Sequence, residues 1–567
     1  MDVAIAPKQL DVFTVQPTKD KNHGDVATNA AMVLCKNFSM KPQDLAQKII
    51  NELQANDKIA KAQIAGPGFI NITLDFAIWQ DFIADIVRKN KVDVPQIAHD
   101  NSGLINLEYA SPNPTGPMHI GHARGAIYGD VLASLLIKTG HKVTKEYYMN
   151  DAGSQINTLL KSAFLRYLEA LGQEITITDG LYPGEYLQPV GQGLKVKFGD
   201  ALQGKSEAEY APLIRDFVLE KMMEMITADL ADIGICHDVL FSEKKNLHDS
   251  GKIDAAIEVL RQQGLVYEGK IADPKGGPKG EKGDVVADGD QLLFRSTKFG
   301  DDEDRVIKKS DGTPTYFAAD IAYVLNKFER GATKMILPLG YDHAGYVKRL
   351  KAACQAVTGG KAQVEVILCQ MVKFIKNGQQ LKMSKRAGNF ITLKDVAAEI
   401  GADALRFTML TRKNDAPFDF DLAQVVDASK DNPIFYVQYA HARCASVLRN
   451  FAEQMPGADI SGIDPKILQN LQDETEIELI KKLANCGRII EMAVQNYEPH
   501  RLAFYAQEVA ALLHSLWNKG VEDANLKFII ANKPQITLAR MALITATKKT
   551  IFTILDIFNI KALEEMR

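Results

Sequence analysis

Two histidines and a glycine, His119, Gly121 and His122, stand where a strand-like stretch gives way to a helical one. The unpaired backbone N–H groups and the dipole at such a helix start favour a bound phosphate. Gly121 has no side chain, so a flat base could lie against its backbone, and the imidazoles could donate hydrogen bonds to phosphate oxygens. The segment predicts a nucleotide site, although two polar residues that solvate a helix start would give the same pattern.

A basic cluster far along the chain is a second candidate. Lys382, Lys385 and Arg386 place three cations within five residues, with Met383 and Ser384 between them. Such a cluster would neutralise a triphosphate and a leaving pyrophosphate, because electrostatic stabilisation dominates this chemistry. A short charge run is more often a solvated loop. Its interpretation therefore depends on its pairing with the histidines.

The elements around the histidines predict an α/β domain. Residues 105–110 are β-like, residues 111–122 form a turn, and residues 123–140 form a helix that ends at Gly140. Residues 141–151 read as the next strand. Strand, helix and parallel strand make a βαβ unit. This unit predicts a Rossmann-type, doubly wound parallel sheet with its site at the carboxyl ends of the strands.

Changes of pattern divide the chain into three expected domains. Residues 1–95 read as a small α/β unit, and residues 96–426 as the domain with the parallel sheet. Residues from about 152 to 265 read as a mostly helical insertion within that domain. Residues 427–567 are almost wholly helical, which predicts an all-α bundle appended to an α/β core.

Four shorter patterns carry expectations of their own. The apolar runs 65–74 and 364–374 each read as one strand, and residues 474–494 read as one helix. The glycine-rich stretch 276–284 reads as a hairpin tip.

Composition narrows the class of protein. The 567 residues are 46% hydrophobic and 24% charged, as in an ordinary protein with large cores. The formal net charge of −4 is mild evidence against a nucleic-acid partner, but 67 Lys and Arg residues could still cluster on one face. The six cysteines are scattered without the spacing of a zinc site, so we expect no protein metal site. Neither a signal peptide nor a membrane span is apparent, which predicts a cytoplasmic protein.

The presence of both the histidine segment and the basic cluster in one chain favours the nucleotide-binding interpretation of each. Together, His119–His122 and Lys382–Arg386 resemble the two signature motifs of class I aminoacyl-tRNA synthetases. The segment Glu108–Asn113 and the segment 310–323 resemble the arginyl branch, so the chain is identified as similar to bacterial arginyl-tRNA synthetases. It departs from some members at Asp342-His343, where they have Asp-Gln, and His343 could still hydrogen-bond the amino-acid head group.

The resemblance implies roles for particular residues. Arginine and ATP would be the substrates, with Mg²⁺ accompanying ATP. A guanidinium needs carboxylates and polar acceptors around its five donors. The implied arginine-binding residues are Glu108, Ser111, Asn113, Tyr316, Asp320 and His343. The implied ATP-binding residues are His119, Gly121, His122, Lys382, Met383, Ser384 and Lys385, of which the two histidines and two lysines would be catalytic.

The same resemblance implies that tRNA(Arg) is the macromolecular partner and that the chain acts as a monomer. In the N-terminal domain, Phe69 would stack on a base and Asn71 would hydrogen-bond to it. Candidate contacts in the C-terminal bundle are Tyr436, Gln438, Tyr439, His441 and Arg443. Helical spacing makes bundle packing the better reading for at least half of these.

Three alternatives stay open at this point. The first is a class I synthetase for another amino acid, which the acidic residues and the absence of zinc-type cysteines disfavour. The second is a smaller nucleotidyltransferase, which would not explain the helical C-terminal part. The third is a synthetase-like RNA-binding protein without activity, which could have lost the phosphate-binding residues that are intact in this chain.

Overall fold

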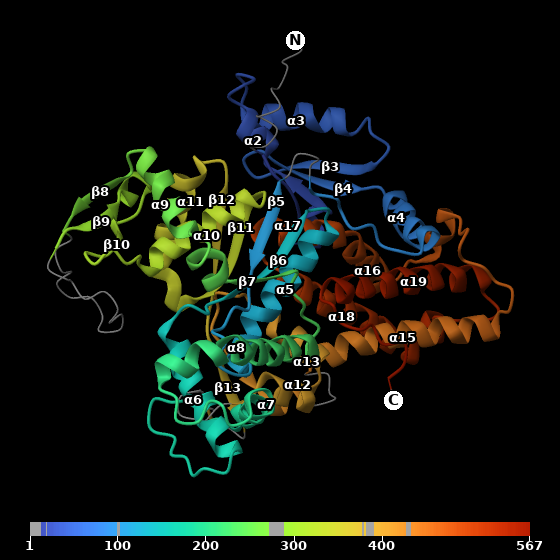
Figure 1. Ribbon diagram of the computed structural model, residues 1–567. Coiled ribbons are helices and arrows are strands. Elements are labelled where there is room, and N and C mark those ends of the chain that lie inside the picture. The colour runs from blue at the N-terminus through green and yellow to red at the C-terminus, as the bar shows by residue number, and fades with distance from the viewer. Residues whose placement is uncertain are drawn as a thin grey trace.

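The computed structural model describes residues 13–18, 20–98, 103–270, 289–376, 379–380, 391–426 and 432–566. Three parts follow one another along the chain in Figure 1. A small blue N-terminal unit lies at one end of the molecule, a sheet with its helices occupies the middle, and orange-to-red helices pack beside that sheet. The predicted fold class is confirmed.

The N-terminal unit is a four-stranded antiparallel sheet in the order β1-β2-β4-β3. Where one strand was expected over residues 65–74, the chain makes a hairpin, because Gly66 and Gly68 adopt positive φ and turn it back. The elements are β1 (Val15–Pro17), β2 (Val26–Thr28), α2 (Ala30–Leu34), α3 (Pro42–Leu53), β3 (Ile59–Ala65), β4 (Phe69–Leu74) and the connecting helix α4 (Phe76–Lys89).

The central sheet is parallel throughout, in the order β12-β11-β5-β6-β7. The predicted βαβ unit is present, and its helix ends before Gly140, which has φ +92°. The strands are β5 (Leu104–Glu108), β6 (Val143–Met149), β7 (Val239–Ser242), β11 (Ala332–Gly340) and β12 (Gln363–Cys369).

Both faces of this sheet are covered by helices. Successive side chains of a strand point to opposite faces, so each strand contributes to two hydrophobic cores. Ile336 of β11 packs with helix α5 (Ala123–Lys138), whereas Met335 and Leu337 pack with the helices of the opposite face. Those helices are α9 (Lys252–Gln262), α10 (Tyr316–Glu329) and α11 (Val347–Thr358). Burial on both faces explains the continuous apolar run Met335–Leu339 of β11.

Residues 152–265 are mostly helical, as expected, but they do not form a single inserted unit. Strand β7 lies within this range and forms the edge of the central sheet, and α9 beyond it belongs to the core over that sheet, so the separate helical insertion ends with α8. The four residues of β7 are too few to give a strand pattern. The helices are α6 (Ser154–Ala170), α7 (Gln188–Phe198) and α8 (Glu207–Asp232), which share a core of their own.

A small antiparallel sheet follows, formed by β8 (Val266–Gly269), β9 (Gln291–Phe294) and β10 (Arg305–Lys308). The hairpin tip expected at 276–284 lies outside the described residues. The run 364–374 divides into β12 and β13 (Val372–Lys376), which pairs with β14 (Gln379–Gln380) and β15 (Phe418–Asp421). The helices of this region are α12 (Leu393–Ile400), α13 (Ala402–Met409) and α14 (Leu422–Val426).

The C-terminal part is the expected helical bundle. The single helix expected over 474–494 is interrupted at Asn485, where two weak helix formers, Asn485 and Gly487, lie close together. Within the described ranges, no helix is long and apolar enough to cross a membrane. The helices are α15 (Pro433–Gln454), α16 (Glu474–Ala484), α17 (Cys486–Asn496), α18 (His500–Glu522) and α19 (Pro534–Ile557).

One buried guanidinium joins the bundle to the central domain. Arg406 of α13 is 1% exposed, and its Nε donates to the carbonyl of Phe558, just after α19, at 2.8 Å. It also donates to the carbonyl of Ile233, at the end of α8, at 2.8 Å and to Asp130 of α5 at 2.6 Å. The guanidinium thus satisfies two carbonyls that helix ends leave unpaired.

Candidate active site

A cavity of about 830 Å³ opens at the carboxyl ends of β5, β6, β11 and β12. This is the position at which open parallel sheets bind ligands. Of the residues singled out from the sequence, those that line it are Glu108, Ser111, Asn113, His119, Gly121, His122 and His343. Positions that the sequence separates by more than two hundred residues therefore meet in one site.

The histidine segment is a tight turn that leads into α5. His119 caps a short 3₁₀ turn, η2 (Ile120–His122), and its backbone N–H donates to Nδ1 of His122 at 3.3 Å. The two rings stack with centroids 3.6 Å apart. A Cβ at Gly121 would lie 2.8 Å from the His119 ring, so no larger residue fits there without a shift. The neighbouring His119 ring therefore requires glycine at position 121, a different reason from the room for a base that the sequence suggested.

The basic cluster, with Lys382, Met383, Ser384 and Lys385, lies outside the described residues, which resume at residue 391. The residues that follow it pair directly with the histidine segment. Ile120 N–H donates to the carbonyl of Ile391 at 3.1 Å, and Leu393 N–H donates to that of Met118 at 2.8 Å. Residues 391–393, which begin five positions after Arg386, are therefore held beside His119.

A buried arginine that the sequence did not single out supports this region. Arg124 of α5 is 3% exposed, and its guanidinium donates to the carbonyls of Gln370 at 3.0 Å, Ala416 at 2.9 Å and Lys413 at 2.7 Å. Gln370 lies between β12 and β13 and lines the cavity. Arg124 thereby holds the part of the cavity wall formed by Gln370.

The opposite end of the cavity is acidic. Glu108 forms an ion pair with the buried Lys327, with 2.5 Å between Oε2 and Nζ. Asp320 accepts a hydrogen bond from the hydroxyl of Tyr346. Burial raises the pKa of Asp320 to about 7, and the carboxylates of Glu243 and Glu108 add to the effect, while the Tyr346 hydrogen bond opposes it. A carboxyl group with a raised pKa, close behind the cavity wall and near Glu108, favours a cationic ligand.

Polar groups of the wall are held by neighbouring residues. The hydroxyl of Ser111 accepts the backbone N–H of Tyr148 at 2.9 Å, and Nδ2 of Asn113 donates to Gln155 at 3.0 Å. His343 is exposed, with its Nε2 3.7 Å from a carboxylate oxygen of Asp342.

Two of the predicted arginine-binding residues stand apart from the wall. Tyr316 and Asp320 share one face of α10, as their spacing predicted, but neither lines the cavity. Tyr316 is 65% exposed because it is the first residue of the helix. Asp320 is partly buried and close enough to Glu108 for their charges to interact. The predicted set therefore divides into a wall and a separate pair on α10.

The comparisons with known proteins agree along the whole chain. Family models match for the arginyl tRNA synthetase N terminal domain (residues 3–74), the class I (R) catalytic domain (83–183), the class I (I, L, M and V) domain (318–421) and the DALR anticodon binding domain (437–566). The arginine–tRNA ligases of Nitrobacter winogradskyi and Rhizobium meliloti are each 49% identical to it, over 99% and 98% of this chain and 95% and 94% of their own. The chain belongs to the arginyl-tRNA synthetase family.

Solved structures of arginyl-tRNA synthetases share its fold. That of Thermus thermophilus has a TM-score of 0.71 at 20% identity and covers 99% of this chain and 98% of its own. That of Plasmodium falciparum has a TM-score of 0.73 at 14% identity, with coverages of 99% and 96%. The fold of the whole chain is thus shared with these structures although most of the residues differ.

The matched N-terminal domain of the arginyl-tRNA synthetase carries the pair Phe69 and Asn71 on strand β4. Phe69 is 41% exposed, so its ring is available for stacking. Asn71 is only 7% exposed, between β2 and β3. The expectation of an accessible amide beside the ring is not met in this structure, since the central position of β4 covers that side chain.

Two of the five bundle candidates hold the C-terminal segment of the synthetase. Gln438 donates to the carbonyl of Lys561 at 3.1 Å, and Nδ1–H of His441 donates to that of Leu563 at 2.8 Å. Both side chains are buried, 8% and 1% exposed. Their prediction as tRNA contacts is wrong in this structure, because the carbonyls of the last residues have taken them as partners.

The other three candidates lie together on α15 of the synthetase. Tyr436 is half-buried against the ring of His514. Tyr439 and Arg443 line a cavity of about 330 Å³ with Trp517. The Arg443 guanidinium lies 4.4 Å from the ring centroid of Tyr439 and 4.3 Å from that of Trp517. Trp517, which the sequence did not single out, completes a cationic aromatic platform.

Proposed function

We propose that this arginine–tRNA ligase forms arginyl-adenylate in the cavity at the ends of β5, β6, β11 and β12. A carboxylate oxygen of arginine bonds to the α-phosphorus of MgATP, and the bond from that phosphorus to the β-phosphate oxygen breaks, which releases pyrophosphate. The nucleophile is already ionised, so positioning and charge neutralisation suffice. The observation that carries this proposal is the meeting of a histidine turn and an acidic end in one cavity.

The nucleotide would bind at the histidine turn. His119 and His122 would donate to the phosphate–ribose region, and the backbone at Gly121 would meet the adenine. Lys382 and Lys385 would meet the β- and γ-phosphates, next to Met383 and Ser384. The pairing of residues 391–393 with the histidine turn supports this assignment, since it brings the chain to this turn five residues after Arg386.

Arginine would bind with its guanidinium at the acidic end and its head group nearer the nucleotide. Glu108 and Asp320 would neutralise the guanidinium. Ser111, Asn113 and His343 would contact the ammonium and carboxylate. Tyr316 would close over the side chain from its exposed position on α10. A neutral isostere would leave a buried carboxylate unpaired, so no editing step is required.

In the second step the 2′-hydroxyl of the terminal adenosine of tRNA(Arg) attacks the adenylate carbonyl and releases AMP. The exposed ring of Phe69 and the platform of Tyr439, Arg443 and Trp517 would each receive an unpaired base. We further propose that the chain works as a monomer in the cytoplasm.

The direct test is incorporation of labelled amino acids into tRNA with ATP and Mg²⁺. Charging by arginine alone, out of a panel of all amino acids, is the expected result. Charging by another amino acid would overturn the assigned substrate. Absence of charging by a folded protein that still binds tRNA would favour an RNA-binding relative without activity.

Arginine affinity is expected to rise with pH. The carboxyl group of Asp320, with its pKa raised to about 7, is largely protonated below that pH, and the guanidinium binds its ionised form. The Kd for arginine should fall by about tenfold between roughly pH 6 and pH 8. Titration calorimetry in buffers of different ionisation enthalpy should record a released proton near pH 7. A pH-independent Kd would contradict the assigned role of Asp320.

Arg443→Ala is expected to raise the KM for tRNA by about tenfold, since stacking on one base is worth about 1–3 kcal/mol. Arginine and ATP affinities should stay unchanged, because α15 lies outside the catalytic cavity. His441→Ala is the contrasting variant: it should lower the Tm and leave the KM for tRNA nearly unchanged in the folded fraction. An unchanged KM for Arg443→Ala would move the base-binding platform elsewhere.

A further inference from the structure

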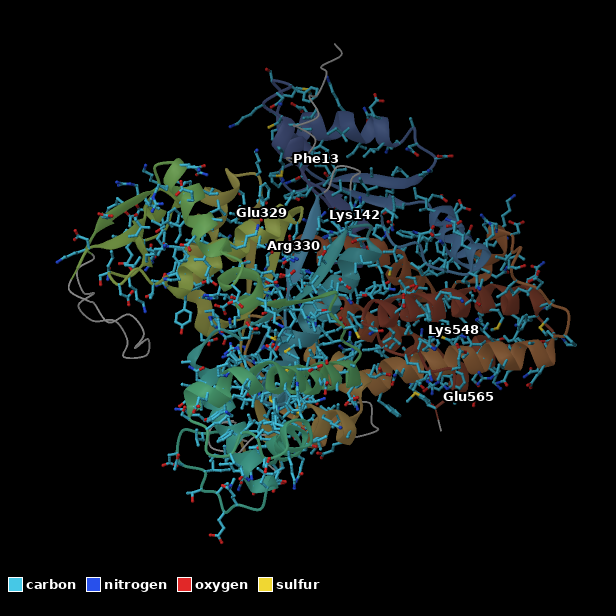
Figure 2. All side chains as sticks on the ribbon, in the orientation of Figure 1. Phe13, Lys142, Glu329, Arg330, Lys548 and Glu565 are labelled. Atoms are coloured by element: carbon cyan, nitrogen blue, oxygen red, sulfur yellow. The ribbon has the colours of Figure 1, made fainter. Side chains whose placement is uncertain are left out.

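Two glutamates stand side by side at the ends of adjacent strands, but in different surroundings. Glu108 of β5 and Glu146 of β6 are direct partners in the sheet register. Glu146 is fully buried, and its carboxylate accepts from Arg330 at 2.6 and 2.9 Å, from Tyr323 at 2.5 Å and from Asn106 at 3.0 Å. Figure 2 shows Arg330 beside these central strands. Glu146 is saturated by protein donors and does not line the cavity.

Glu108 lines the cavity, and Lys327 is the one hydrogen-bond donor that the described part of the chain brings to its carboxylate. The ammonium binds Oε2 and leaves Oε1 for other partners. Lys327 is 2% exposed, and lysine is almost never buried so deeply without a specific partner. Its Nζ also lies 4.1 Å from the ring centroid of Tyr323.

Helix α10 carries both this ammonium and Asp320, the residue proposed to bind the substrate guanidinium. Asp320, Tyr323 and Lys327 follow one another at helical spacing and so share one face. We propose that Lys327 is a positioning residue for arginine recognition, which holds Glu108 as a carboxylate by one oxygen and presents the other to the guanidinium. The inference rests on the proposed arginine site.

The charges around Glu108 explain why this counter-ion is needed. Charged and titratable groups surround Glu108 both on the cavity wall and on the elements packed behind it. Tyr148, Asp342 and His343 line the cavity. Behind the wall lie Glu146 of β6, Glu243 and His248 after β7, Asp320, Tyr323, Lys327 and Arg330 from α10 and its end, and Tyr346 after β11. Burial raises the pKa of Tyr148, and Glu243, Asp320 and Glu108 all raise it further, so three carboxylates surround this one ring.

Arg330 is committed to Glu146, which leaves Lys327 to balance Glu108. Without that ammonium, the carboxyl group of Glu108 would face Asp320 and Glu243 in a buried site, which favours its neutral form. A neutral carboxyl group at this place would present a donor, or an uncharged acceptor, to a guanidinium. Arginine affinity would fall as a consequence, and raising the pH would partly restore it by ionising the group.

The test is the Kd for arginine, by titration calorimetry of the full chain, in Lys327→Met and Lys327→Arg. Loss of one member of a buried charge pair predicts a Kd for Lys327→Met about 30-fold above that of the parent near pH 6.5. The ratio should fall below about fivefold near pH 8.5. Lys327→Arg, which keeps the cation, should stay within about threefold. The Kd for ATP should be the same in all three proteins.

Two controls separate this inference from the site on which it rests. Lys348→Met removes an exposed lysine paired with Asp302 and should leave the Kd for arginine unchanged. Glu108→Gln should raise that Kd. If Glu108→Gln leaves it unchanged, the proposed arginine site is wrong. If Glu108→Gln raises it and Lys327→Met does not, or does so with a ratio that is independent of pH, the positioning role alone is overturned.

A double variant keeps the test decisive if Lys327→Met does not fold. Glu108→Gln/Lys327→Gln removes both charges together, which is less costly than leaving one of them buried alone. Because Lys327 acts through Glu108, the Kd of the double variant should equal that of Glu108→Gln. A further rise of more than about threefold would show that Lys327 acts on arginine by another route, and would overturn the proposal.

Discussion

Lys385→Ala is expected to slow the formation of arginyl-adenylate by about 10²–10³-fold, the usual effect of removing one group that stabilises developing charge. The lysine would neutralise the pyrophosphate as it leaves, and this charge is fully developed only during the reaction. Arginine does not contact the β- and γ-phosphates that this lysine would bind, so the Kd for arginine should change little. Tritiated or fluorescent arginine binding and ATP–pyrophosphate exchange with tRNA present would measure the two quantities separately.

Lys394→Ala is the matched control, since Lys394 is an exposed lysine on α12, just beyond the segment that pairs with the histidine turn. It should exchange pyrophosphate at the parental rate. Parental turnover by Lys385→Ala would show that the basic cluster is not the phosphate site. A large rise in the Kd for arginine would instead show that the loss is in folding or in the architecture of the cavity.

Asp320→Asn is expected to raise the KM for arginine by about 100-fold, because truncating one partner of a buried charge pair costs about 2–5 kcal/mol. The substitution keeps the shape and replaces an ionisable acceptor by a neutral amide, part of which is a donor. Turnover at saturating arginine should fall much less, since the reacting carboxylate lies at the other end of the amino acid. Steady-state charging at varied arginine concentration measures both constants.

The same variant should also lose the pH dependence of arginine affinity that Asp320 is expected to confer. Asp302→Asn removes an exposed acid that pairs with Lys348, and should behave as the parent does. An unchanged KM for Asp320→Asn would place the guanidinium elsewhere. Citrulline, the neutral isostere of arginine, should bind the variant and the parent with similar weak affinity.

Much of the fold was predictable because its signals are local. The strand, turn and helix between residues 105 and 140 carry apolar runs, a proline- and glycine-rich turn and a glycine stop, and all of them are present. Strand β7 was missed because four residues carry no periodicity, and only its pairing with β6 makes it a strand. The break at Asn485 was missed because weak helix formers also occur inside continuous helices.

The residues of the site that belong to a recognisable sequence motif were predictable. His119, Gly121 and His122 meet Glu108 and Asn113 in one cavity, as their order around a βαβ unit requires. The supporting residues could not be found in this way. Arg124 lies 246 residues before Gln370, whose carbonyl it binds, and Lys327 lies 219 residues after Glu108. Nothing in the neighbourhood of either residue signals so distant a partner.

The bundle illustrates a further limit of sequence patterns. Gln438, Tyr439, His441 and Arg443 are all polar or aromatic residues on one helix, and the sequence treats them alike. The structure distinguishes them by their contacts with the C-terminal segment. Gln438 and His441 donate hydrogen bonds to the carbonyls of Lys561 and Leu563, whereas Tyr439 and Arg443 line a cavity. Which residues of α15 can contact a partner therefore depends on where the C-terminal segment packs, which the sequence of α15 does not contain.

The junction at Arg406 has a consequence for how the chain is made. Synthesis proceeds from the N-terminus, and domains generally fold in that order. Here Asp130 and Arg406 lie within the catalytic part, yet the guanidinium also needs the carbonyl of Phe558. Until the ribosome has added that residue, the buried charge pair lacks one of its partners. The catalytic core therefore reaches its final form only after the bundle has been synthesised through Phe558, so a nascent chain that ends before this residue does not hold the finished core.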